Sequence, residues 1–255
     1  MRNGFVGVFL LACLVLAQPA LAQRCEHSRD IDLATDATGV NLAVITAGAG
    51  ELTIEGGLTD QVVIEGRACA SDAGRLEEMS VEIDPRGDRL EIETQIPDGW
   101  SWTGGRYAYI DLHIRVPSGM AVRVVDGSGN LAIRDVASVQ LEDGSGNVEL
   151  SGIRGDVSVD DGSGNLDLAA VGGEIWVHDG SGNIDIRDAG SVVIDSDGSG
   201  SIEVDGVHDS VIVHSDGSGA IWVASVGGDF TVHRDGSGGI RHSDVAGTVK
   251  IPKQR

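Results

Sequence analysis

The stretch Asp126-Gly127-Ser128-Gly129-Asn130 (DGSGN) decides the fold, because the chain repeats it at nearly constant spacing. Successive copies begin 17 to 19 residues apart. The five letters return unchanged in three copies and modified in three more, and the later copies begin at Asp143, Asp161, Asp179, Asp197 (DGSGS), Asp216 (DGSGA) and Asp235 (DGSGG). A fixed period of this kind is typical of repeat architectures, in which each unit stacks on the next.

Apolar residues recur at five positions between successive copies. In the first repeat these positions hold Leu131, Ile133, Val136, Val139 and Leu141. The spacing of two within each pair predicts strands whose apolar side chains point inward. The sequence therefore predicts an all-β protein, a parallel β-solenoid with about seven regular coils of 17–19 residues. Each buried aliphatic side chain contributes roughly 1.5 to 3 kcal/mol, so the stack needs no metal for its stability.

The DGSG segment is expected to form a tight corner of each coil. Glycine tolerates positive φ, and Asp and Asn side chains bond nearby backbone amides. Stacking places the seven repeat-corner aspartates in one column, namely Asp126, Asp143, Asp161, Asp179, Asp197, Asp216 and Asp235. In bulk water each neighbouring pair would cost only about 0.9 kcal/mol at strand spacing, a repulsion that does not demand a metal. Calcium bound at the corner is the alternative.

Two outward columns of the predicted coils carry candidate binding residues. The first is an acidic stripe, formed by Glu149, Asp167, Asp185 and Glu203. The second is a histidine column, formed by His178, Asp195, His214 and His233. Imidazole and carboxylate groups at this spacing suit zinc or copper. A solvated polar face or a pH-sensitive contact surface would account for the same column, and no other cofactor is expected.

The first 22 residues read as a secretory signal peptide. Arg2 precedes an apolar run that ends near Leu16, and Ala20-Leu21-Ala22 supplies a small-x-small cleavage site. Lipoprotein processing at Cys13 is the weaker alternative. Cleavage would leave Cys25 and Cys69 as the remaining cysteines, and an oxidising compartment predicts a disulfide between them. We therefore expect an exported protein of the periplasm, the outer surface or the exterior.

The remaining chain divides by regularity into two parts. Residues 23–120 are expected to form degenerate N-terminal coils and a hairpin of the same solenoid, and residues 121–255 form the regular repeat. An early coil is expected at residues 50–64, and a hairpin at residues 79–96. Trp100 and Trp102 are expected to fold over an open edge or end of the solenoid, and stacking on sugar rings is the weaker alternative.

The formal net charge of −22 limits the choice of partners. A field of this sign repels phosphate backbones and anionic lipid, so it disfavours nucleic acid and membrane surfaces. No transmembrane segment is expected once the signal peptide is removed. The remaining partners are a surface, a glycan or a protein, with end-to-end or edge association as a further option. Pro252 and three basic residues near the C-terminus discourage a further strand from adding there.

The chain also resembles a known group of proteins. The Gly-rich start at Gly50, the lead-in Val116-Pro117-Ser118-Gly119 and the repeated Gly-x-φ-x-φ coils, in which φ is an apolar residue, are similar to the bacterial putative-adhesin β-strand-repeat family of unknown function. The resemblance covers roughly residues 40 to 251. It implies an exported, β-helix-like protein with an adhesin label, and it supplies no catalytic residues.

These features favour a non-enzymatic cell-envelope protein, adhesin-like or structural, that uses its flat faces for contact. A cation-binding solenoid with calcium or zinc is the alternative. A polysaccharide-acting enzyme is disfavoured, because the corners of the repeat region are too short to build a cleft. A serine nucleophile beside His214 would lack an oxyanion hole, so no catalysis is expected.

Overall fold

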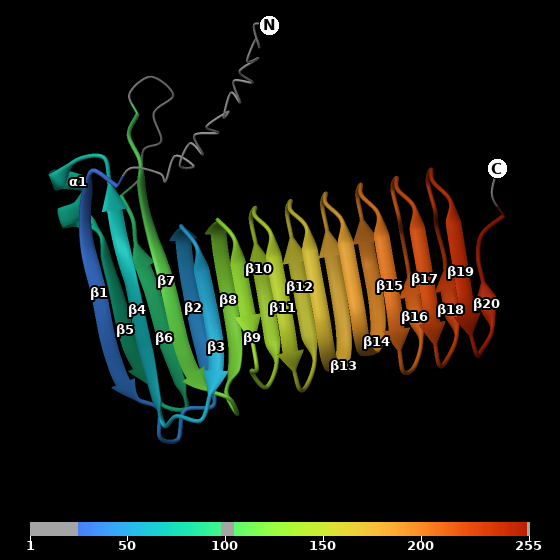
Figure 1. The fold of residues 1–255 in the computed structure, drawn as a ribbon, viewed down its shortest axis with the longest axis horizontal. Coiled ribbons are helices and arrows are strands. Elements are labelled where there is room, and N and C mark those ends of the chain that lie inside the picture. Colours follow the sequence, from blue (N-terminus) through green and yellow to red (C-terminus); the bar gives the residue numbers. More distant parts are fainter. Residues whose placement is uncertain (1–24, 98–104, 254–255) are drawn as a thin grey trace, which may run out of the picture.

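The computed structural model describes residues 25–97 and 105–253, and nearly all of its regular structure is β-strand. Figure 1 shows a row of stacked coils that ends, on the N-terminal side, in a group of longer strands. The predicted parallel β-solenoid is therefore confirmed. The expected signal peptide, Trp100 and Trp102 lie outside the described residues. Within these ranges, no helix has the length and apolar character needed to cross a membrane.

The described residues of the N-terminal part form seven strands and one short helix. In chain order these are β1 (His27–Asp36), β2 (Leu42–Ala49), β3 (Leu52–Gly57), β4 (Gln61–Ala70), α1 (Ala73–Glu78), β5 (Ser80–Arg86), β6 (Arg89–Gln95) and β7 (Ala108–Pro117). The regular part adds β8 (Ala121–Ser128), β9 (Leu131–Arg134), β10 (Val139–Asp143), β11 (Val148–Ile153), β12 (Val157–Asp161), β13 (Leu166–Asp179), β14 (Ile184–Asp197), β15 (Ile202–Val207), β16 (Val211–Val213), β17 (Ile221–Val226), β18 (Phe230–Val232), β19 (Ile240–Val245) and β20 (Val249–Lys250).

The coils stack through parallel pairing, with equivalent residues side by side. One wall follows the order β8, β10, β12, and Val139 pairs with both Val122 and Val157. The other wall follows β9, β11 and the first half of β13, so Val148 pairs with both Leu131 and Leu166. β13 and β14 each run through a corner and contribute to both walls. In-register stacking of this kind places every repeat position in a column along the solenoid.

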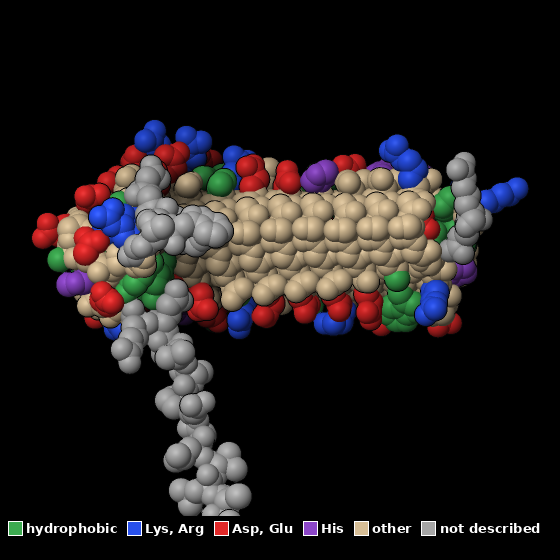
Figure 2. Space-filling model, turned by 90° about the horizontal axis from the view of Figure 1, so that it is seen from above, with side chains coloured by type: hydrophobic (Ala, Val, Ile, Leu, Met, Phe, Trp, Pro, Cys, Tyr) green, Lys and Arg blue, Asp and Glu red, His purple; other side chains and the backbone are tan. Residues whose placement is uncertain are grey.

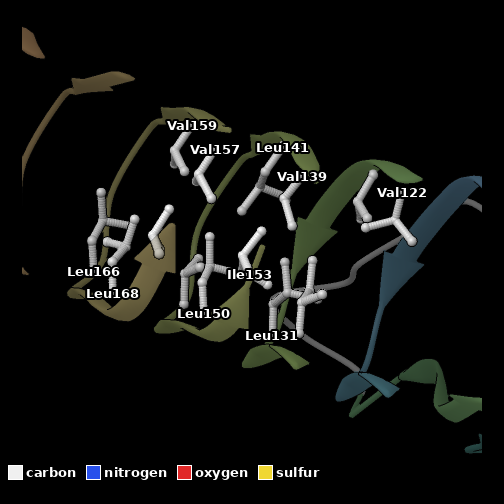
Figure 3. Packing of buried hydrophobic residues seen from close by; sticks show 14 of the residues in the cluster. Val122, Leu131, Val139, Leu141, Leu150, Ile153, Val157, Val159, Leu166 and Leu168 are labelled. Atoms are coloured by element: carbon white, nitrogen blue, oxygen red, sulfur yellow. The ribbon is translucent and has the colours of Figure 1, made fainter. Parts of the chain in front are cut away.

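The core lies between the two walls. Figure 3 shows Leu141, Val157 and Val159 pointing toward the opposite wall, which supplies Leu150, Ile153 and Leu166. The predicted inward positions are buried from Leu131 through Val232, as the period of two requires. In the last coil Ile240, Val245 and Val249 are only partly buried, His242 is exposed, and Ile251 is 40% exposed. The apolar columns therefore form the core until the stack ends.

The first coil and the N-terminal end differ in part from the sequence prediction. β2 and β3 form a coil that stacks on β8 and β9, and β5 and β6 form the expected hairpin. The segment that contains Val62 and Ile64, however, does not continue this coil. It belongs to β4, which runs antiparallel to both β1 and β7. Alternation predicts a strand but not its direction, so these antiparallel pairings were missed.

Candidate functional site

The repeat-corner aspartates point into the solenoid. The column runs from Asp126 to Asp235 through parallel pairings, and its members other than Asp235 are at most 6% exposed. Figure 2 looks onto the corner band and shows neutral side chains and backbone across it, with acidic and histidine side chains along its margins. The expectation that these carboxylates stack in bulk water is therefore wrong, and the small repulsion derived for water does not apply.

Burial changes the acidity of these carboxyl groups, because a low-dielectric environment disfavours the charged form. Burial raises the pKa of Asp126 to about 6, and burial together with neighbouring carboxylates raises the pKa of Asp143 to about 7. The same causes raise the pKa of Asp179 to about 6 and that of Asp197 to about 7. Burial also raises the pKa values of Asp161 and Asp216. Burial therefore makes the six aspartates from Asp126 to Asp216 weaker acids than a solvated aspartate.

The sequence contained a signal for this inward orientation. In the first four copies of the motif, the aspartate stands two residues after the last inward apolar position, as Asp143 does after Leu141. Strand alternation makes that position inward. The later coils contain one extra residue before the aspartate. In β14 this extra residue is Asp195, which forms a bulge: Val177 pairs with Ile194, but His178 pairs with Ser196.

Glycine at the corner is required by the close approach of stacked coils. A Cβ on Gly127 would lie 2.4 Å from the carbonyl oxygen of Gly48. The second glycine of the motif, represented by Gly164, also has a φ of +151°, which side chains rarely tolerate. The motif therefore has a structural reason for each glycine, independent of any ligand.

Asparagine side chains form a hydrogen-bonded ladder beside the corner. The side-chain oxygen of Asn147 accepts from the backbone N–H of Asn165 at 3.2 Å and from its side-chain amide at 3.1 Å. The pattern repeats from Asn130 to Asn183, and it ends where the backbone N–H of Ser201 donates to Asn183. These asparagines link successive coils and leave few polar groups free for a partner.

The acidic stripe lies along the outside of one wall. Glu149 pairs with Asp167, Asp167 with Asp185, and Asp185 with Glu203. Arg187 moderates the repulsion, since it contacts Asp185 at 2.6 Å and Asp167 at 3.5 Å. Arg187 and Asp167 are exposed and Asp185 is partly exposed, so each ion pair contributes only about 1 kcal/mol or less. The stripe remains a candidate cation-attracting surface without a defined ligand.

The histidine column resolves into two pairs. Nδ1 of His178 lies 3.5 Å from Oδ2 of Asp195, and Nδ1 of His214 lies 2.9 Å from Nδ1 of His233. No group of three or more His, Cys, Asp or Glu side chains within residues 25–97 and 105–253 is arranged to hold a metal ion. A closed zinc site uses four ligands. The predicted zinc or copper site therefore stays a prediction, with two imidazoles close enough to act together.

A further surface column was missed by the sequence analysis. It occupies the outward position between the last two apolar positions of each repeat, on the wall that contains β8, β10 and β12. Register pairs place Arg123, Gln140, Ser158, Trp176, Val193 and Ile212 side by side on successive coils. We call this set the Trp176 column. The sequence signal was the change from polar to apolar residues at one outward position.

A shallow groove follows the polar half of the Trp176 column. Its lining includes Arg123, Gln140, Ser158 and Trp176, with Asp156 and Glu174 at the side. Arg123 donates to the side-chain oxygen of Gln140 at 2.8 Å. The ring of Trp176 stacks with that of His178 at an interplanar angle of 15°. The groove thus combines a flat aromatic surface with hydrogen-bonding groups.

The predicted disulfide is present at the N-terminal end of the molecule. It joins Cys25 to Cys69, the latter in β4. It ties the start of the described chain to the antiparallel strands, far from the Trp176 column. An intramolecular disulfide is compatible with an exported protein.

Solved structures share this fold. A structure described as a putative adhesin from Bacteroides fragilis NCTC 9343 matches with a TM-score of 0.50 and 16% sequence identity, covering 88% of this chain and 97% of that chain. The putative-adhesin resemblance inferred from the sequence is thereby confirmed at the level of the fold. At this identity the likeness concerns the fold alone.

Two further structures match over similar lengths. A putative cell adhesion protein from Clostridium sporogenes ATCC 15579 has a TM-score of 0.41 and 12% identity, covering 89% of this chain and 100% of that chain. A putative lipid binding protein from Parabacteroides distasonis ATCC 8503 has a TM-score of 0.46 and 16% identity, covering 88% and 96%. No family model matches the chain, and no curated protein matches its sequence.

Proposed function

We propose that this protein is a non-enzymatic, adhesin-like solenoid of the cell envelope or exterior that binds a glycan surface through the Trp176 column. The observation that carries the proposal is the position of Trp176, which lies between hydrogen-bonding residues on one side and Val193 and Ile212 on the other. An aromatic ring packs on the apolar face of a sugar, and the neighbouring polar groups suit its hydroxyls.

Charge narrows the class of glycan. The chain carries a formal net charge of −22, and Asp156 and Glu174 line the groove. An anionic polymer would be repelled, so a neutral or basic polysaccharide fits best. The adhesin names of the structural neighbours agree with a role in surface contact. Export to the periplasm, the outer surface or the medium is part of the proposal, and the disulfide between Cys25 and Cys69 supports it.

A binding role without catalysis also accounts for the chemistry beside His214. Its Nδ1 faces His233, whereas a catalytic base would have to face the hydroxyl of a serine. We therefore expect bound polysaccharide to remain intact when it is incubated with the protein.

The test is binding of the mature chain to a panel of immobilised neutral, basic and acidic polysaccharides. Trp176→Ala should weaken binding to the preferred neutral or basic polymer about tenfold, which corresponds to about 1.4 kcal/mol. Trp222→Ala is the matched control, because Trp222 is 37% exposed and lies on the other wall, beside Glu203. Equal effects of the two variants, binding confined to acidic polymers, or release of reducing sugar would each contradict the proposal.

A further inference from the structure

The aspartates of the first three complete repeats form a continuous row inside the corner. Asp126 pairs with Asp143, and Asp143 pairs with Asp161, on adjacent parallel strands. Their exposed fractions are 4%, 6% and 1%. Parallel strands lie about 4.8 Å apart, so neighbouring carboxyl groups are within reach of each other. The row is therefore a set of adjacent acids that water does not separate.

The oxygen atoms of this row lack donors. Neither oxygen of Asp126 or Asp143 has a hydrogen-bond partner within the described structure. Asp161 accepts one hydrogen bond, from the backbone N–H of Ser163 at 3.3 Å, and its other oxygen has none. Buried polar groups are almost always paired, and an unpaired buried charge costs several kcal/mol. Three ionised carboxylates in this position would be a severe cost to the fold.

The elements around the row supply no compensating positive charge. The facing wall contributes the buried apolar residues Leu131, Val148 and Leu166. The acids on that wall, Glu149 and Asp167, lie on its outer side, where they are exposed. On the wall of the row itself, the preceding residues Val125, Glu142 and Asp160 are exposed as well. The row therefore faces apolar side chains, backbone, its own members and, beyond Asp161, the buried carboxyl group of Asp179 on the next coil.

A proton resolves this conflict more simply than a metal ion does. A protonated carboxyl group is a donor, so it can bond to the carboxylate beside it, and two adjacent acids then share one proton. Aspartic-protease dyads hold two carboxyl groups in this way. A metal would need further ligands, and no suitable group of three or more acidic, histidine or cysteine side chains occurs in the part of the chain described.

We propose that Asp126, Asp143 and Asp161 are held as a chain of proton-sharing carboxyl groups, so that the row carries fewer negative charges than it has aspartates. The inference is independent of glycan binding, since it concerns the interior of the corner and not the Trp176 column. It makes the corner of the solenoid a proton-binding element whose charge depends on pH.

The sign of the pH dependence follows from burial. The unfolded chain binds protons at these sites only below about pH 4. The folded chain holds them to higher pH, because burial raises the pKa of Asp126 to about 6 and that of Asp143 to about 7. The contribution of the row is therefore fully present below about pH 4, and it is lost as pH rises through 6 to 7.

The test is urea unfolding of the mature protein between pH 4.5 and pH 8, for wild type, Asp143→Asn and Asp167→Asn. Asparagine is neutral and of similar shape, so Asp143→Asn should reduce the pH dependence of the unfolding equilibrium constant by about tenfold or more over this range. Asp167→Asn removes an exposed acid of the acidic stripe and should leave the slope near that of wild type. Equal slopes in wild type and Asp143→Asn would overturn the proposal.

A second readout does not depend on the variant folding. The infrared spectrum of the native wild-type protein at pH 6 should contain the carbonyl band of protonated carboxyl groups, and the band should disappear when urea unfolds the chain at the same pH. Asp126→Asn, at the end of the row, should reduce the band. Absence of the band from the native protein at pH 6 would show fully ionised aspartates and would overturn the proposal.

Discussion

The carbonyl oxygen of Gly146 occupies the space that a Cβ on Gly164 would need, at a separation of only 1.5 Å. Gly164 also has a φ of +151°. Both features follow from the same cause, because the corners of successive coils stack backbone on backbone. The second glycine of each DGSG motif is therefore fixed by the neighbouring coil as well as by its own turn.

Gly164→Ala should destabilise the protein by about 2 kcal/mol or more, since the side chain meets backbone and the dihedral angle is unfavourable. Gly239→Ala is the control, because a Cβ there meets nothing within 4 Å. Urea unfolding of both variants measures the difference. A Gly164→Ala variant as stable as Gly239→Ala would contradict the stacking described for the corner.

At the opposite corner of the coil, introducing a glycine is expected to stabilise the fold. Ala170 has a φ of +54°, in the left-handed region that costs an alanine about 1 to 2 kcal/mol. Ala170→Gly should therefore stabilise the fold by about 0.5 to 1 kcal/mol, after the entropy that glycine loses on folding. Ala169→Gly, one residue earlier in β13, should destabilise it. Thermal melting compares the two, and a decrease in both would argue against this corner conformation.

The disulfide should stabilise the fold because it lowers the conformational entropy of the unfolded chain. Cys25 and Cys69 are 44 residues apart, and closing a loop of that size is worth about 4 kcal/mol in the chain-entropy model. Cys25→Ser together with Cys69→Ser should lower the melting temperature in the absence of reductant. Reduced wild type should melt near the double variant. A melting temperature that reduction does not change would mean that the bond adds no stability.

The regular coils could be predicted from the sequence because their chemistry repeats. Leu131 and Ile133, Val139 and Leu141, and their equivalents in later coils show a spacing of two within each pair and a repeat of about 18 residues. The first predicts strands, and the second predicts that the strands stack. The N-terminal strands lack such repetition. β4 contains the same alternation as a coil, and only its pairing with β1 and β7 shows that it runs antiparallel to them.

The candidate sites were less predictable, for physical reasons that particular residues illustrate. Asp143 was placed at a corner and treated as solvated, although its spacing from Leu141 marks it as inward. An aspartate is normally exposed, but the position of Asp143 in the strand points inward. The side chain is buried because the backbone of the corner covers it. Trp176 was assigned to no site, because its role depends on its neighbours in the stacked coils, Ser158 and Val193, which are 18 and 17 residues away in the sequence.

The central claim is that the repeated aspartates are an internal, proton-sharing part of the corner and not a calcium site. The most direct test is thermal unfolding of the protein at pH 6, first with a chelator and then with excess calcium. We predict the same melting temperature in both conditions. A large increase with calcium that Asp143→Asn abolishes would contradict the claim and would identify the row as a cation site.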